Sequence, residues 1–246
     1  SPEAARRAVR TLKRSDADLI KIMPSGGVMS IGDDPSVQLM ADDEIKAVVE
    51  TAHALGMKVA AHAHGKQAID HAIALGVDSI EHGNYADAES YKLFKAHGTY
   101  FVPTMLVGEK VYEHAKTHPE DLNPSTIQKA LTVVPYMQKN LHDAYAAGVK
   151  IAFGTDTFGM SAHGENAQEF ALMVRAGMTP MDAILAATAN AADLIGDTKD
   201  IGSIQPGRYA DIIAVTGDPL ADVKVLENVG FVMKGGVVYK GQPGGR

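Results

Sequence analysis

The stretch KVAAHAHG, residues 58–65, is a short apolar run that ends in two histidines two positions apart. Because side chains alternate between the two faces of a strand, His62 and His64 lie on the same face if this run is a strand. Helical patterns precede it at residues 42–57 and follow it at residues 66–77, and both end around a Leu-Gly pair, a left-handed helix stop. We therefore predict a buried strand between two helices, the repeating unit of an α/β fold.

The same alternation continues through most of the chain. Near-continuous apolar runs are typical of parallel strands that are buried on both faces. Such runs lie at residues 18–23, 58–64, 78–83, 100–105 and 150–156. Helical patterns lie before residue 18 and at residues 42–57, 66–77, 86–98, about 124–148, 165–177 and 180–195. For the last of these, Thr179 is the expected cap and Pro180 lies in the first turn. The alternation predicts a parallel sheet with right-handed connections.

The pattern changes after about residue 200. Residues 201–220 and 229–242 are rich in glycine and β-branched residues, with turn signals at Pro206-Gly207 and Gly235-Gly236. This pattern predicts short antiparallel strands in a small β-module. We therefore expect two domains, a barrel-like part over residues 1–199 and the module over residues 200–246.

Composition excludes several classes of protein. The 246 residues carry a net charge of -7 without a block of Lys and Arg, so we expect neither nucleic acid nor a membrane as a partner. There is no cysteine, so a metal must be held by nitrogen and oxygen. The first residues form a capped amphipathic helix that runs straight into a strand. We expect that the true N-terminus lies elsewhere, which leaves the cellular location open.

Polar residues gather where the strands are expected to end. Lys21 lies in the first strand, His62 and His64 close the second, His82 closes the third and Asp156 closes the fifth. The carboxyl ends of parallel strands carry the active site in such folds. A lone buried histidine is usually a packed core residue, but several unpaired polar groups in register would each cost roughly 1–3 kcal/mol. A shared Zn²⁺, Mn²⁺ or Co²⁺ ion explains why they converge.

These residues stand in recognisable motifs. DLIKIMPSGGVMS, VAAHAHG, DSIEHG, VPTM and FGTDT resemble the amidohydrolase superfamily, in its branch of Xaa-Pro dipeptidases, Lys/Arg carboxypeptidases and imidazolonepropionases. The tail GSIQPGRYADIIAVTGDPL resembles the C-terminal part of the small composite β-domain of that family. The resemblance implies an α/β fold of the (β/α)8 TIM-barrel type of metal-dependent hydrolases. Barrel strands four to eight and a small C-terminal β-module would be present, and the N-terminal part would be missing.

The resemblance also implies chemistry. Lys21 would be the lysine that is carboxylated to a carbamate and bridges two divalent metals, zinc in the first instance. His62 and His82 would be metal ligands, and Asp156 would bind metal and move the proton while a metal-activated water hydrolyses an amide. The substrate would be a small peptide or an N-acyl amino acid, and family members of this kind form homo-oligomers.

Three further residues are candidates for binding the substrate. The resemblance places His64 in the pocket beside the metal ligand His62. Tyr85 follows the His82 strand, and His163 follows Asp156. For Tyr85 a surface position at the start of a helix explains the sequence equally well, and His163 could equally cap the next helix.

One departure from the family pattern leaves two alternatives open. The family carries a His-x-His motif on its first barrel strand, whereas the His-x-His of this chain, His62 to His64, follows Lys21 and matches strand five. The chain could therefore be an incomplete or non-catalytic half-barrel that needs a partner chain with the missing His-x-His. An ordinary α/β binding domain with unrelated histidines is the third interpretation, and it requires several coincidences.

Overall fold

The computed structural model describes residues 1–157, 159–160 and 162–241. The α-helices are α1 (Pro2–Arg14), α2 (Asp42–Ala54), α3 (Lys66–Ala74), α4 (Ala88–His97), α5 (Met105–Thr117), α6 (Pro124–Val133), α7 (Tyr136–Ala146), α8 (Gln168–Arg175), α9 (Pro180–Ala187) and α10 (Ala189–Ile195). The strands are β1 (Leu19–Ile22), β2 (Lys58–Ala63), β3 (Ser79–His82), β4 (Tyr100–Val102), β5 (Ile212–Val215), β6 (Val229–Lys234) and β7 (Val237–Lys240). Two 3-10 turns are η1 (Pro119–Asp121) and η2 (Val223–Glu227). None of the helices in the described ranges combines the length and apolarity of a membrane span.

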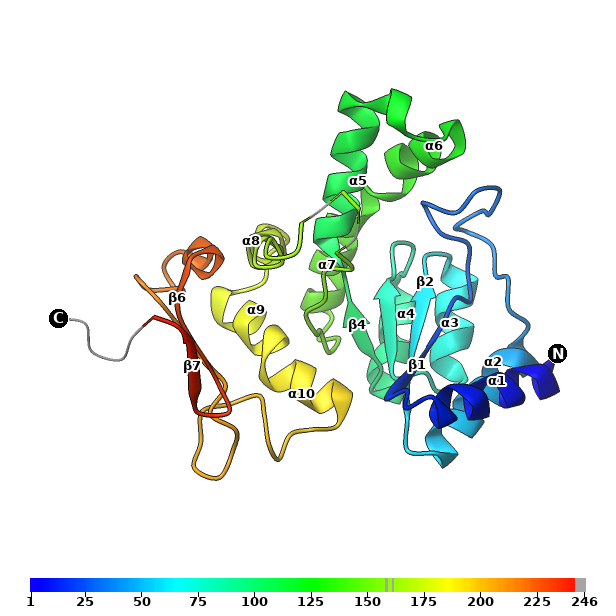
Figure 1. Cartoon of the computed structure of the whole chain (residues 1–246). Coiled ribbons are helices and arrows are strands. Elements are labelled where there is room, and N and C mark those ends of the chain that lie inside the picture. The colour runs from blue at the N-terminus through cyan, green and yellow to red at the C-terminus, as the bar shows by residue number, and fades with distance from the viewer. Residues whose placement is uncertain (158, 161, 242–246) are drawn as a thin grey trace.

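The centre of the fold is a parallel sheet with the strand order β1-β2-β3-β4 (Figure 1). Each strand pairs with the next one in sequence, and the register places Lys21 beside Ala60 and His62 beside Glu81. One face of the sheet carries the fully buried Ala61 and Ile80 and packs against α2 and α3. The opposite face carries Lys21, His62 and Glu81. This partial barrel confirms the predicted fold class, because the strand ends meet at one edge as expected.

The helices between the strands end as the sequence predicts. The residue Gly98 caps α4 in the left-handed conformation, with φ 70°. Gly56, directly after the cap of α2, has φ 72°. Side chains other than glycine rarely adopt this conformation, so these glycines stop the helices and turn the chain into the next strand.

Two of the predicted strands differ from the structure. The strand predicted over residues 100–105 ends at Val102, because Thr104 has a left-handed backbone with φ 47° and Met105 starts α5. The strand predicted over residues 150–156 is reduced to a single bridge between Ile151 and Phe101. On its other side the backbone N–H of Phe153 donates to the carbonyl of Ala186, in a helix, so no second ladder extends it.

Two predicted helices are divided. The long helix expected over about 124–148 is α6 followed by α7, and the break lies at Pro135. Proline has no N–H and its ring clashes with the preceding turn, which explains the interruption. The helix expected over 180–195 breaks at Thr188, whose φ and ψ of -125° and -90° are not helical. The expected cap is confirmed, because Thr179 Oγ1 accepts from the N–H of Asp182 at 3.1 Å.

The C-terminal part forms the antiparallel sheet β5-β6-β7, which confirms the predicted β-module. Its β6–β7 turn contains Gly235 and Gly236, both with positive φ. The segment η2 packs against α8 and buries Val223 and Leu226. The last predicted residues of the module, 242–246, lie outside the described residues.

Candidate active site at the strand ends

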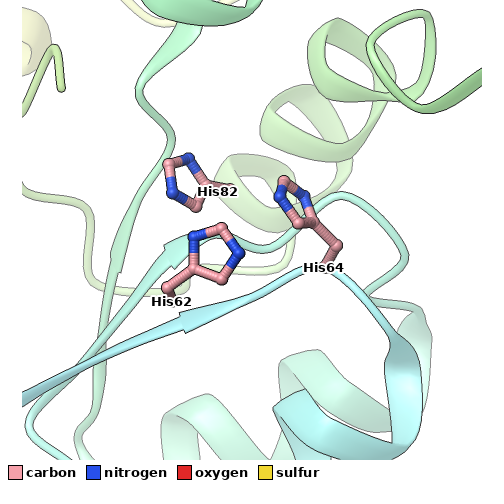
Figure 2. A group of neighbouring side chains, drawn as sticks. All are labelled: His62, His64 and His82. Atoms are coloured by element: carbon pink, nitrogen blue, oxygen red, sulfur yellow. The ribbon is translucent and has the colours of Figure 1, made fainter. Parts of the chain in front are cut away.

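Three histidine rings face one another at the carboxyl ends of β2 and β3 (Figure 2). The ring centroids of His62 and His82 are 4.6 Å apart, and those of His62 and His64 are 4.7 Å apart. Each ring offers one nitrogen, and these nitrogens all lie within 4.8 Å of one another. All three side chains are buried. The convergence predicted from the strand pattern is therefore present.

Burial keeps these imidazoles neutral. It lowers the pKa of His62 to about 4 and that of His64 to about 3, and it lowers the pKa of His82 well below its usual value. The positive charges that the rings would place on one another, and that of Lys21, act in the same direction. Neutral imidazole is the form that binds a divalent metal. The donor set therefore fits a metal such as zinc.

In His82 and His64, hydrogen bonds fix which ring nitrogen is free. Nδ1 of His82 donates to Oγ1 of Thr104 at 2.7 Å, while that hydroxyl donates to the carbonyl of Pro103 at 2.8 Å. Nδ1 of His64 donates to Oδ1 of Asn84 at 2.8 Å. In both rings the Nε2 atom is left as the acceptor nitrogen. Partners of this kind orient imidazole ligands at metal sites.

Backbone strain is concentrated at the same place. The backbone φ is 72° at His82, 47° at Thr104 and 48° at Asp156. These values lie in the left-handed region, which residues other than glycine seldom adopt. Each conformation of this kind costs of order 1–3 kcal/mol and persists where the surrounding structure enforces it. Three strained residues at the ends of neighbouring segments indicate a functional site.

A buried carboxylate holds one of these turns. Glu169 of α8 is fully buried, and its two oxygens accept from the N–H groups of Met105 at 2.8 Å and Leu106 at 2.6 Å. These are the first residues of α5, so the carboxylate caps that helix from another element. Burial raises the pKa of Glu169 to about 8. The capped turn carries Thr104, the hydrogen-bond partner of His82, so Glu169 supports the site indirectly.

Asp156 and Lys21 complete the predicted ligand set. Asp156 Oδ2 lies 3.9 Å from Nε2 of His82, and its side chain is half exposed. Partial burial raises the pKa of Asp156, opposed by the charge of Lys21. Partial burial also lowers the pKa of Lys21, opposed by the charges of Glu81 and Asp156. Lys21 lies on β1, the outer strand of the described sheet, where its side chain keeps part of its surface exposed.

The three candidates for substrate binding lie at different depths. His64 lines the cavity beside the cluster. Tyr85 is half-buried, and its ring meets that of Tyr136 edge-on at 5.4 Å. Burial raises the pKa of Tyr85. His163 is exposed in the segment between Asp156 and α8. Contact of these three residues with a substrate stays a prediction.

A long loop, residues 23–41, covers the cluster from the side of β1. The carbonyl of Gly26 lies 3.3 Å from Nε2 of His62, and Oγ of Ser25 accepts from the N–H of His64 at 2.9 Å. The loop also presses on Gly65, where any Cβ would collide with the carbonyl of Ser36. The glycine after the His-x-His is therefore required for the loop to approach.

Lys129 of α6 holds the same loop from the opposite side. Its buried ammonium donates to the carbonyls of Gly27 at 2.9 Å and Asp33 at 3.1 Å, and also to that of Ser30. Burial lowers the pKa of Lys129, while Asp33 and Asp34 raise it. The lysine thus joins the loop to the helices on the far side of the cavity.

Sequence reasoning did not identify four of these residues. Asn84, Thr104, Lys129 and Glu169 support the site through partners that are distant in sequence, at separations of up to 102 residues for Lys129. The HGN and VPT motifs were available as signals for Asn84 and Thr104, because both directly follow strand ends. Nothing in the local pattern distinguishes Glu169 or Lys129 from surface residues of their helices.

Comparison with known proteins identifies one family. A family model described as "Amidohydrolase family" matches residues 1–240. Ochratoxinase from Aspergillus niger is 40% identical over 244 residues, which are 97% of this chain and 50% of ochratoxinase. Imidazolonepropionase from Deinococcus deserti is 30% identical over 186 residues, covering 74% of this chain and 41% of the relative. The chain spans about half the length of the curated relatives it matches.

A solved structure is similar to this chain over nearly its whole length. The crystal structure of a Xaa-Pro dipeptidase with methionine bound in its active site matches with a TM-score of 0.95 and 43% identity. The match covers 98% of this chain and 59% of the dipeptidase. The resemblance drawn from the motifs, including its branch and its partial extent, is confirmed.

Proposed function

Because this chain belongs to the amidohydrolase family, we propose that it supplies the greater part of the active site of a metal-dependent hydrolase that cleaves an amide bond. The observation that carries the proposal is the group of three neutral imidazoles, His62, His64 and His82, with Asp156 beside them at the strand ends. Ochratoxinase and the Xaa-Pro dipeptidase support an amide or peptide bond as the target. A small peptide or an N-acyl amino acid is the substrate class we propose.

The residues present suit two divalent metals, zinc in the first instance. His62, His82, Lys21 and Asp156 would hold them, and a bound metal would supply Lewis-acid activation of a water molecule and of the scissile carbonyl. We propose that Lys21 carries a carbamate. Its lowered pKa favours the neutral amine, which is the form that adds CO₂.

Proton transfer is assigned to Asp156. Its raised pKa brings it closer to the range in which a carboxylate can accept a proton from the attacking water and pass it to the leaving amine. His64 keeps Nε2 as an acceptor toward the cavity, because its Nδ1 donates to Asn84. It would therefore orient a substrate N–H group. Loop 23–41 and the strand-end turns exclude water from one side.

We further propose that another part of the barrel, in the same or in a separate polypeptide, packs against β1 and brings a His-x-His to the first metal. Two observations support this. Lys21 is exposed at the outer strand of the described sheet, and the chain matches about half of its relatives. We also propose self-association of the completed enzyme, which sedimentation velocity of the complex would detect.

The test is metal content and hydrolysis, measured together. Elemental analysis of the purified chain is expected to find zinc or a similar divalent metal, and His62→Ala and His82→Ala are expected to lose it. His97→Ala is the control, because His97 is exposed on α4 away from the cluster. N-acyl amino acids and dipeptides are then assayed with and without the complementary barrel segment. Full metal retention in both variants, or no hydrolysis by the completed barrel, would contradict the proposal.

A further inference from the structure

A cavity of about 190 Å³ opens beside the three imidazoles. The histidines form one side of it. Loop 23–41, helices α5 and α7 with the adjoining Val134, and the strand-end residues Asn84 and Asp156 provide the rest. The aliphatic side chains of this wall are Val28, Met29, Val107, Val111, Val134 and Met137.

The cavity offers a substrate little charge. Among the described residues that line it, Asp156 is the one that carries a formal charge at neutral pH. Lys129 is not among these lining residues, and its ammonium donates to three main-chain carbonyls of the loop. An acidic side chain placed here would therefore be desolvated, would lie near the carboxylate of Asp156, and would find no lysine or arginine among the described lining residues.

We propose that this cavity is a specificity pocket that binds one apolar side chain, of the size of leucine, methionine or phenylalanine, next to the scissile amide. This inference rests on the proposed function, whose substrate class it narrows. The volume of the cavity suits a side chain of this size, because an apolar cavity of about 150 Å³ binds benzene. The position of the cavity also suits this role, because it adjoins the imidazoles and Asp156. A side chain bound in it would place the backbone of the same amino acid at the cluster.

Gly108 sets the depth of the pocket. It is buried in α5, and a Cβ at this position would collide with Sδ of Met137 and lie 3.6 Å from Cγ1 of Val134. Both neighbours belong to the pocket wall. An added methyl group must therefore displace Met137 or fill space that a ligand would use. We assign Gly108 and Met137 as the residues that determine the largest side chain accepted.

Binding of free amino acids tests the pocket without requiring turnover. The zinc-loaded full chain is titrated by calorimetry with L-phenylalanine, L-leucine, glycine and L-aspartate, which contain no bond that the enzyme can hydrolyse. We expect phenylalanine and leucine to bind at least about tenfold more tightly than glycine, as burial of an apolar side chain provides, and aspartate to bind no better than glycine. Equal affinities, a preference for aspartate, or no binding of phenylalanine would overturn the proposal.

Two variants locate the effect. Gly108→Ala is expected to weaken phenylalanine binding by about fivefold or more while glycine binding stays unchanged. Met181→Leu is the control, because Met181 is exposed on α9 and is not among the lining residues, and it is expected to bind all four amino acids as the parent chain does. If Gly108→Ala lowers the thermal stability, Val111→Ala serves instead, and its larger pocket is expected to shift the preference from leucine toward phenylalanine. Unchanged preferences in both Gly108→Ala and Val111→Ala would place the side chain elsewhere.

Failure of the pocket proposal can be distinguished from failure of the proposed hydrolase activity. A preference for apolar amino acids with no hydrolysis would support the pocket and count against the proposed activity. Hydrolysis of N-acetylglycine and N-acetyl-L-phenylalanine with the same kcat/KM would support the activity and overturn the pocket.

Discussion

At the scale of single residues, the site depends on a relay in which two hydrogen-bonded contacts are joined by the backbone. Glu169 accepts from the N–H groups of Met105 and Leu106, and the adjoining Thr104 accepts from Nδ1 of His82. Each link fixes the next in position. The last one decides which nitrogen of His82 is free to bind a metal. A defect at either end is therefore expected to change the proposed metal site without replacing a proposed ligand.

Thr104→Val tests the last link. The valine keeps the shape of threonine but leaves Nδ1 of His82 without its acceptor inside the protein, at a cost of roughly 1–3 kcal/mol. We expect a lower melting temperature and a weaker affinity for zinc, measured by competition with a chelator. Thr99→Val is the matched control, because the hydroxyl of Thr99 is also buried but donates to the carbonyl of Val77. Equal zinc affinity in the two variants would contradict the relay.

The buried carboxylate of Glu169 predicts a pH effect on stability. Its pKa in the folded chain is raised to about 8, above the usual value near 4.5. The group therefore contributes its full stability below about pH 4.5 and loses it as the pH rises through about 8. We expect the melting temperature of the parent chain to fall between pH 6 and pH 9 more steeply than that of Glu169→Gln, which does not titrate. Parallel curves would show that Glu169 keeps its charge across this range.

Residues of the site differ in how far the sequence alone predicts them. His62 and His82 are predictable because parallel strands bring their carboxyl ends together, and Asp156 because its segment still runs parallel to β4 at the bridge between Ile151 and Phe101. The role of Thr104 is not predictable, because it depends on a positive φ after β4. The role of Glu169 is not predictable either, because its hydrogen-bond partner Leu106 lies 63 residues away in the sequence. Periodicity describes neighbours within one element and says nothing about such long-range partners.

At the scale of elements, loop 23–41 and the helices α5 to α7 enclose the cluster, and Lys129 joins them. The ammonium neutralises the partial charges of three converging carbonyls, which would otherwise repel one another. Loop and helices therefore act as one unit around the cavity. Such a contact is expected to suppress local opening of the loop.

Lys129→Met tests this contact, because methionine keeps the aliphatic length and removes the three donors. We expect faster amide hydrogen exchange in residues 23–41, measured by mass spectrometry, and a stability loss of roughly 1–3 kcal/mol. Lys139→Met provides the comparison, since Lys139 is exposed on the neighbouring α7 and pairs with Asp143. Exchange that is equally fast in both variants would show that the loop is held by other contacts.

The sequence carries a local signal for some of the element boundaries and none for others. Pro135 lies within the predicted helix 124–148, and its missing N–H was a local signal for the break that the structure shows. The reduction of strand 150–156 to one bridge has no local signal. Residues 150–156 have the composition of a strand, but strand length depends on whether a second strand lies alongside.

At the scale of the whole molecule, exposed apolar side chains on the outer strand and on the β-module bear on association. The outer strand β1 exposes Leu19, and the β-module exposes Ile213, Val237 and Tyr239, which are between 47% and 71% exposed. An unpaired outer strand and exposed apolar residues favour association with another chain. The proposed completing segment of the barrel would cover β1.

We therefore expect this chain on its own to self-associate as its concentration rises, as measured by sedimentation velocity. Leu19→Lys combined with Tyr239→Lys is expected to shift the distribution toward the monomer while leaving the melting temperature within a few degrees, because both side chains are exposed. Parent and variant chains that are monomeric at all concentrations would show that these surfaces tolerate water.

The strand order also has a consequence for how the chain folds. Since every strand of the parallel sheet pairs with its neighbour in sequence, each pairing closes only one loop, and the cost of closure grows slowly with loop length. The registers join Ala60 to Ser79 and Ser79 to Tyr100, whereas Leu19 must reach Lys58 across the long loop. On the cost of loop closure alone, we therefore expect the segment from β2 to β4 to pair first and β1 to dock afterwards. His62 and His82 would then be in place early in folding, so the proposed metal would meet this pair before Lys21 arrives.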